Sequence, residues 1–261
     1  MKIRTGTLSK YKAEGHKFSM LTSYDALTAE IFDSCGIEVL LVGDSAGNVV
    51  LGHRSTVPVT LDEMIPFGKA VASAAKSALV VVDLPFGSYE VSAAQALENS
   101  IRVIKETEAD AVKLEGAKLE QIRALTKNGI PVMGHLGFTP QSVNQLSGYK
   151  VQGRGQDAQQ LIDQALAVEE AGAFAIVFEM VPASLAAEIT KLLRIPTIGI
   201  GAGANCDGQV LVWTDMAGLS GRTPSFAKQF ANLREVLTQA TINYRDEVAS
   251  GAFPEPERDF S

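Results

Sequence analysis

The 261-residue sequence predicts an α/β protein, a single-domain (β/α)8 TIM barrel. Eight short apolar runs are spread along the chain, and each ends on polar residues or glycines. Between them lie segments whose apolar residues recur at helical spacing. The length also matches the roughly 250 residues that are usual for eight strand-helix units closed into a barrel.

The apolar runs are predicted to be strands buried on both faces, as in a parallel sheet. For the run at 38–47, periodicity alone does not exclude a short helix. In chain order the runs are KFSMLTSYD (17–25), EVLLVGDSAG (38–47), SALVVVDLP (77–85), ADAVKLEGA (109–117), GIPVMGHLG (129–137), AFAIVFEMVP (173–182), RIPTIGIGAG (194–203) and QVLVWTDM (209–216).

The segments between the runs are predicted to be crossover helices. Residues 92–110 and 157–173 place apolar side chains on one face and charges on the other. Thr60 followed by Glu63 matches a capping box that starts another helix. Pro182 suits the first turn of a helix in PASLAAEITKLLR.

Strand and helix alternate evenly, which favours a closed barrel over an open doubly wound sheet. No second composition zone interrupts the pattern. We therefore expect residues 1–261 to form one barrel domain with a short N-terminal extension and a C-terminal helix.

Composition narrows the classes of partner and compartment. A net charge of −7 disfavours nucleic acid and anionic lipid as partners, so a small molecule is expected. The apolar stretches fall short of the roughly 20 residues that a membrane helix needs. The N-terminus carries no apolar signal segment, and Cys35 and Cys206 have no metal or redox spacing. These features predict a cytoplasmic protein with reduced thiols.

The ends of the strands carry the residues suited to chemistry. Active sites in this fold lie at the carboxyl ends of the strands. We therefore expect Asp44, Asp83, Lys113, Glu115 and Glu179 to converge on one rim of the barrel.

Several carboxylates on one rim repel each other unless a cation lies among them. Oxygen ligands, with only three histidines in the chain, favour Mg²⁺ over zinc. Such a metal can polarise the carbonyl of a 2-oxo acid toward an enolate, and Lys113 adds positive charge nearby. Glu179 is then the free carboxylate that can act as the base.

Ordered sequence blocks carry a resemblance to a known family. They are MLTSYDA, LLVGDSAGNVVLGHRSTVPVT, VVVDLPFGSY, AVKLEG, IPVMGHLGFTPQS, FEMVPA and IPTIGIGAGANCDGQVLVWTDMAGL. In this order they resemble the signature segments of the ketopantoate hydroxymethyltransferase family, over about residues 3 to 255.

The resemblance implies a reaction and roles for individual residues. The family transfers a one-carbon unit from 5,10-methylenetetrahydrofolate to 3-methyl-2-oxobutanoate, giving 2-dehydropantoate for pantothenate and coenzyme A. By this resemblance Asp44 and Asp83 bind Mg²⁺ and the 2-oxo acid, and Glu115 completes the metal site. Ser45 and Lys113 bind substrate, and Glu179 is the catalytic base. The family also implies a homo-oligomer, typically decameric.

Alternatives remain open at this point. One is a magnesium-dependent 2-oxo acid lyase or mutase of the phosphoenolpyruvate mutase and isocitrate lyase type, although the lyase motif of lysine, cysteine, glycine and histidine is absent. Another is a sensor or scaffold that binds a 2-oxo acid without turnover. The glycine-rich segment GIGAG (199–203) follows the seventh strand, where barrels often bind phosphate, so a phosphorylated substrate is a further alternative. Residues 137–156 are either a lid or an ordered surface excursion. His135, at the strand end before them, either forms hydrogen bonds that support the site residues or is a structural histidine.

Overall fold

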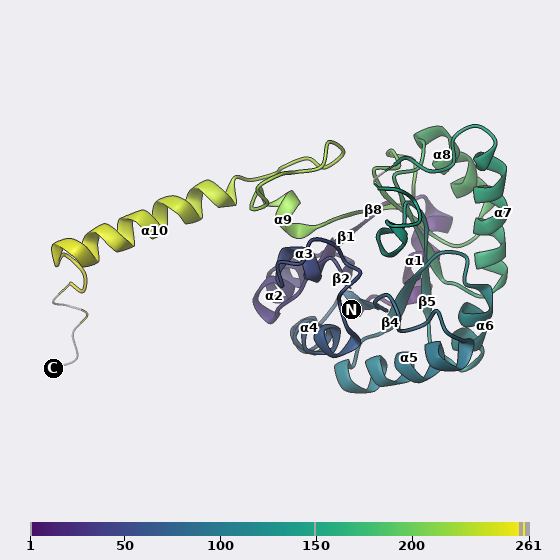
Figure 1. The fold of residues 1–261 in the computed structure, drawn as a ribbon, viewed down its shortest axis with the longest axis horizontal. Helices are drawn as coiled ribbons and strands as arrows, with labels where there is room; N and C mark the ends of the chain where they lie inside the picture. The colour runs from purple at the N-terminus through teal and green to yellow at the C-terminus, as the bar shows by residue number, and fades with distance from the viewer. Residues whose placement is uncertain (1, 149, 256–257, 259–261) are drawn as a thin grey trace. The chain divides into compact units, whose positions relative to one another are not determined.

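Eight parallel strands close into a barrel in which each strand pairs with the next and β8 pairs with β1 (Figure 1). The computed structural model describes residues 2–148, 150–255 and 258. The strands are β1 (Phe18–Thr22), β2 (Val39–Val42), β3 (Leu79–Asp83), β4 (Ala111–Glu115), β5 (Val132–Gly137), β6 (Ala175–Glu179), β7 (Thr197–Ile200) and β8 (Gly208–Leu211). Each coincides with one of the eight apolar runs, so the predicted barrel is confirmed and the open sheet is excluded.

Helices connect the strands and lie around the barrel (Figure 1). They are α1 (Thr5–Glu14), α2 (Ala26–Ser34), α3 (Ala46–Val49), α4 (Leu61–Ala74), α5 (Ala93–Thr107), α6 (Leu119–Lys127), the 3₁₀ turn η1 (Pro140–Ser142), α7 (Asp157–Glu170) and α8 (Ala183–Leu192). The predicted capping box is present at α4, where Thr60 and Glu63 each bond the other's backbone N–H. Helix α8 begins directly after Pro182, one residue later than predicted.

The apolar core fills the amino-terminal half of the barrel. Its members include the first residues of several strands, among them Phe18, Val39 and Leu79, all buried. Leu8 of α1 belongs to the same cluster and is fully buried. Burying a leucine side chain contributes about 1.5–3 kcal/mol, so α1 closes this end of the barrel and stabilises it.

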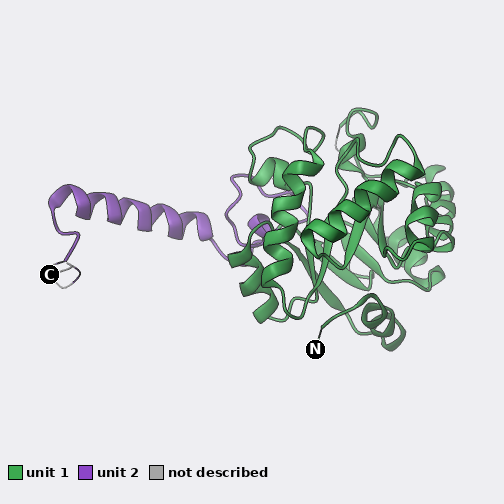
Figure 2. Cartoon of the chain, turned by 90° about the horizontal axis from the view of Figure 1, so that it is seen from below, with its two compact units in different colours: residues 1–212 green, residues 213–261 purple. Residues whose placement is uncertain are grey.

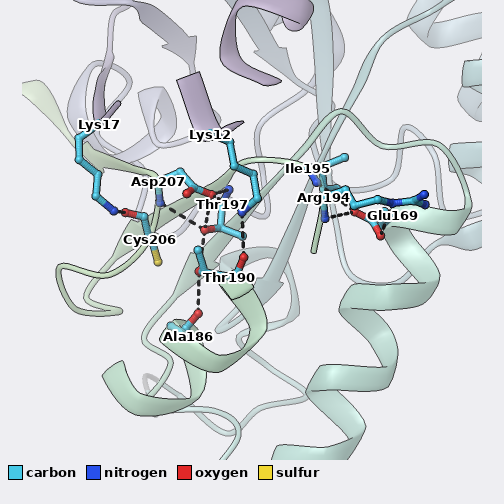
Figure 3. A network of polar contacts seen from close by, with 10 residues as sticks. All are labelled: Lys12, Lys17, Glu169, Ala186, Thr190, Arg194, Ile195, Thr197, Cys206 and Asp207. Atoms are coloured by element: carbon cyan, nitrogen blue, oxygen red, sulfur yellow. Dashed lines mark hydrogen bonds and ion pairs between the residues drawn. The ribbon is translucent and has the colours of Figure 1, made fainter. Parts of the chain in front are cut away.

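A polar network ties α1 to the same end of the barrel (Figure 3). Lys12 Nζ lies 2.8 Å from Asp207 Oδ2 and donates to the carbonyl of Thr190, also at 2.8 Å. Asp207 precedes β8 and accepts a hydrogen bond from the backbone N–H of Thr197, the first residue of β7. Lys12 and Asp207 therefore balance each other's charge, and the other groups that contact the Asp207 carboxylate are hydrogen-bond donors.

The chain divides into two compact units, residues 1–212 and 213–261, coloured separately in Figure 2. All eight strands lie in the first unit. The second contains α9 (Trp213–Met216) and α10 (Leu233–Ser250), and the backbone N–H of Leu233 donates to the carbonyl of Ala217 within it. Among the described residues, no helix is long and apolar enough to cross a membrane. The predicted single domain over 1–261, with its N-terminal extension and C-terminal helix, stays a prediction.

Candidate active site

The barrel brings the predicted site residues to one end because its strands are parallel. Asp83 ends β3 and lies opposite Lys113 of β4 in the strand register. Glu115 ends β4 and lies opposite His135 of β5. Glu179 ends β6. The four predicted residues among these, which are far apart in sequence, therefore occupy the carboxyl rim, as predicted from the strand ends, and His135 lies beside them.

Asp44 and Ser45 reach the same rim from the turn after β2. The backbone N–H of Asp44 donates to Asp83 Oδ2 at 3.1 Å, which joins the ends of β2 and β3. Ser45 is half-buried, and its Oγ lies 2.8 Å from the hydroxyl of Tyr24, which follows β1. Tyr24 is buried, and its burial raises the pKa of its phenol, so the hydroxyl stays protonated.

The centre of the rim contains several buried charged side chains. Asp44, Asp83, Lys113 and Glu115 are each at most 4% exposed. Lys113 Nζ forms an ion pair of 2.5 Å with Asp83 Oδ1. Three buried carboxylates thus lie near one lysine, which leaves an excess of negative charge in a buried site.

The pKa values respond to this surplus. Burial raises the pKa of Asp44 well above its ordinary value, and Asp83 and Glu115 raise it further. Burial also raises the pKa of Asp83, against the lowering effect of Lys113. Burial acts to lower the pKa of Lys113, but the surrounding carboxylates outweigh it and raise that pKa. The lysine therefore stays charged, and the carboxylates lack enough positive charge to balance them.

A second chain of charges runs from Glu115 through His135 to Glu179. His135 Nδ1 lies 3.5 Å from Glu115 Oε1, and its Nε2 lies 3.4 Å from Glu179 Oε2. Burial and Lys113 act to lower the pKa of His135, but the two carboxylates outweigh them and raise it to about 9. His135 is therefore an imidazolium at neutral pH. The side chain of Glu179 is 15% exposed, which makes it the most open of these groups.

Gly137 fixes the start of the segment 137–156 against the backbone of Glu179. It lies opposite Glu179 in the register of β5 and β6 and has a φ of 93°. A Cβ atom at this position would collide with the carbonyl oxygen of Glu179, which accepts a hydrogen bond of 2.8 Å from the N–H of Phe138. Only glycine meets both requirements.

Sequence reasoning missed Gln141, which lies in η1 of the same segment. It is 5% exposed, and its Nε2 donates to Asp44 Oδ2 at 2.8 Å. Its backbone N–H donates to Glu115 Oε2 at 3.0 Å. Its place shortly after a rim strand was the only signal in the sequence. The lid role of 137–156 stays a prediction, and Tyr149 lies outside the described residues.

The donor set fits a hard divalent cation held by few protein ligands. Within the described part of the chain, no three histidine, cysteine or acidic side chains converge as a metal-binding group. Mg²⁺ is commonly held by one or two carboxylates, with water and substrate oxygens completing its shell. Asp44 and Asp83, joined by the hydrogen bond from the Asp44 N–H, are candidates for such a pair, and Glu115 is bonded to Gln141 and faces His135 beside them. The roles of all three as metal ligands stay predictions.

Comparison with known proteins assigns the family. A model of the ketopantoate hydroxymethyltransferase family matches residues 2–256. The chain belongs to this family. A 3-methyl-2-oxobutanoate hydroxymethyltransferase of Leifsonia xyli subsp. xyli is 60% identical, over 99% of this chain and 95% of that protein. One of Mycobacterium avium is 60% identical, over 99% of this chain and 92% of that protein. The resemblance seen in the ordered blocks is confirmed.

Solved structures share the fold of this ketopantoate hydroxymethyltransferase family member at low identity. A phosphonopyruvate hydrolase in complex with oxalate and Mg²⁺ superposes with a TM-score of 0.65 at 14% identity, covering 98% of this chain and 93% of the other. A 2,3-dimethylmalate lyase of the phosphoenolpyruvate mutase and isocitrate lyase superfamily gives 0.60 at 15%, covering 100% and 93%. These likenesses support the barrel, while the family assignment rests on the 60% relatives.

Proposed function

We propose that this enzyme transfers a hydroxymethyl group from 5,10-methylenetetrahydrofolate to 3-methyl-2-oxobutanoate, forming 2-dehydropantoate for pantothenate and coenzyme A. The observation that carries the proposal is 60% identity, over 99% of the chain, to a protein named for this reaction. That identity favours hydroxymethyl transfer over the lyase or mutase alternative, whose structural relatives are 14 and 15% identical.

The buried charges suit a 2-oxo acid and a cation together. We assign Asp44 and Asp83 to hold Mg²⁺, with Glu115 acting directly or through water, because all three carboxylates are buried at the same rim. Bound Mg²⁺ supplies Lewis acidity that polarises the 2-oxo group of the substrate. Lys113, charged and buried, places positive charge beside the substrate oxygens. The hydroxyl of Ser45, oriented by Tyr24, donates to the substrate.

Glu179 is the proposed base that removes the proton from C3 of the substrate. Its side chain is more open than the other rim carboxylates, so it can approach a bound molecule. The imidazolium of His135, 3.4 Å away, balances the charge of its carboxylate. The electron pair released at C3 then forms the new carbon-carbon bond to the methylene carbon of the folate, and the two carbon-nitrogen bonds of that carbon break. Water supplies the hydroxyl group of the product, and its remaining proton and the proton taken from C3 go to the two folate nitrogens, so tetrahydrofolate leaves.

The deciding experiment is an assay with 3-methyl-2-oxobutanoate, 5,10-methylenetetrahydrofolate and Mg²⁺, read by mass spectrometry as 2-dehydropantoate. We expect product that depends on all three components. A purified, folded protein that forms none at saturating concentrations overturns the proposal. Binding of the 2-oxo acid without any product would favour the sensor or scaffold reading.

Assembly and location complete the proposal. The resemblance predicts a homo-oligomer, typically a decamer, and multi-angle light scattering of the purified protein would measure its mass. The predicted cytoplasmic location and the absence of nucleic-acid and membrane partners stay predictions.

A further inference from the structure

Gln141 connects more parts of the rim than any residue assigned above. Its Nε2 donates to Asp44 Oδ2 at 2.8 Å and to the carbonyl of Leu84 at 3.0 Å. Its Oε1 accepts a hydrogen bond from the hydroxyl of Tyr89. The backbone N–H of Gln141 donates to Glu115 Oε2. One buried residue thus contacts the segments that follow β2 and β3 and the end of β4.

The surrounding donors and acceptors fix the orientation of the amide. The backbone N–H of Glu115 can only donate, and it donates to the Tyr89 hydroxyl at 3.1 Å. Tyr89 therefore gives its single hydrogen to Gln141 Oε1. A flipped amide would turn Oε1 toward the Asp44 carboxylate and the Leu84 carbonyl, which are both acceptors. Nε2 must face Asp44.

This arrangement divides the two oxygens of Asp44. Oδ2 is held by Gln141, whereas Oδ1 takes no part in that hydrogen bond. A carboxylate that is hydrogen-bonded through one oxygen is fixed in rotation and offers the other to a ligand. Hydrogen bonds of this kind tune metal affinity, and removing them typically costs 10- to 100-fold.

We infer that Gln141 is a positioning residue, which holds the Asp44 carboxylate so that Oδ1 is presented to Mg²⁺ and the 2-oxo acid. The inference rests on the proposed function, because it takes Asp44 as part of that site. It also gives the segment 137–156 a defined link to the rim, since η1 carries Gln141. Through Gln141, this segment contacts Asp44, the carboxylate proposed to bind Mg²⁺.

Isothermal titration calorimetry of the full chain with MgCl₂, without substrates, tests this role. Gln141→Met keeps the length of the side chain but removes its three hydrogen bonds, including the one to Asp44, so Mg²⁺ affinity should fall 10- to 100-fold. Gln152→Met is the matched control, because Gln152 lies in the same segment and its Nε2 donates to the carbonyl of Lys150, away from the rim carboxylates. The control should bind Mg²⁺ within twofold of the wild type.

Kinetics provide a second readout. In the hydroxymethyl-transfer assay, the Mg²⁺ concentration for half-maximal rate should rise in Gln141→Met, whereas kcat at saturating Mg²⁺ should fall less than threefold. General loosening of the fold by Gln141→Met would instead lower its kcat at saturating Mg²⁺ by more than threefold, and that result would overturn the inference.

The outcomes separate this inference from the proposed function. A Gln141→Met protein that binds Mg²⁺ within threefold of the wild type overturns it, as does an equal loss in Gln152→Met. If Gln141→Met does not fold, Gln141→Asn decides by the same criterion, because it stays polar but is one methylene too short to bond Tyr89 and Asp44 together. A wild type that forms 2-dehydropantoate but binds no Mg²⁺ overturns the inference and leaves the reaction standing.

Discussion

The two ends of the barrel use buried charge in opposite ways. At the amino end, Lys12 and Asp207 form a matched pair, and the remaining contacts of the carboxylate are hydrogen-bond donors. At the carboxyl end, four carboxylates face one lysine and one histidine, namely Asp44, Asp83, Glu115 and Glu179 with Lys113 and His135. The first arrangement stabilises the fold. The second leaves more negative than positive charge, which a bound cation can balance. The residues that favour binding therefore lower the stability of the protein at this end.

Changing the base at the carboxyl end should give the largest effect. Glu179→Gln removes the proton acceptor while preserving the shape, so exchange of the C3 hydrogen of 3-methyl-2-oxobutanoate should slow by about 10² to 10⁴. NMR in deuterated water without folate measures this exchange, and affinity for Mg²⁺ and the 2-oxo acid should change little. Glu188→Gln, an exposed position on α8, is the control. Exchange at the wild-type rate would remove Glu179 from its role as the base.

His135 makes the carboxyl end sensitive to alkali. Its pKa of about 9 in the folded protein exceeds the ordinary value of 6.5, so its stabilising contribution is complete below pH 6.5 and is lost as the pH rises through 9. The shift corresponds to roughly 3 kcal/mol. Urea unfolding from pH 6 to 10 should show the difference between wild type and His135→Asn shrinking by that order. His16→Asn, at an exposed position, should show no such trend, and a pH-independent difference for His135 would contradict the assignment.

Neutralising an acid should have opposite effects at the two ends. Asp44→Asn relieves a carboxylate that burial and its neighbours disfavour, so the free energy of unfolding without metal should rise by about 1 kcal/mol. Its Mg²⁺ affinity should fall at least about tenfold. Asp207→Asn, the matched change at the amino end, should lower stability and leave Mg²⁺ binding intact. Urea titration and calorimetry measure the two quantities, and destabilisation by both variants would break the contrast.

The smallest effect is expected from the lysine of the amino end. Lys12→Met keeps most of the aliphatic side chain but loses the bonds to Asp207 and to the carbonyl of Thr190. The free energy of unfolding should fall by about 1 kcal/mol, as for a single partly buried hydrogen-bonded charge. Activity at saturating Mg²⁺ should be unchanged. A loss of activity without a loss of stability would show that the two ends are coupled.

The strands and the rim were predictable because both depend on local sequence. Each apolar run marks a strand, and Asp83, Glu115 and Glu179 are the last residues of theirs, so the parallel barrel alone brings them to one end. The bond between Gln141 and Asp44 spans 97 positions and depends on how η1 folds over the rim. Tyr24 and Ser45 likewise meet only through the packing of β1 beside β2. Such contacts follow from side-chain geometry, which no spacing rule contains.

Gly137 has no functional group, but it should tolerate substitution as poorly as a catalytic residue does. Its φ and the carbonyl of Glu179 leave no room for a side chain. In a library of all substitutions, expressed in cells whose growth depends on this enzyme, position 137 should therefore reject every substitution, as is also expected of position 179, the proposed base. The two positions should differ in one respect: protein yield should fall along with growth in a Gly137 variant whose backbone is displaced, whereas a Glu179→Gln variant should lose growth and keep its yield. A position at this rim can therefore be intolerant of substitution for two reasons: its functional group is needed for the reaction, or its backbone leaves no room for a side chain.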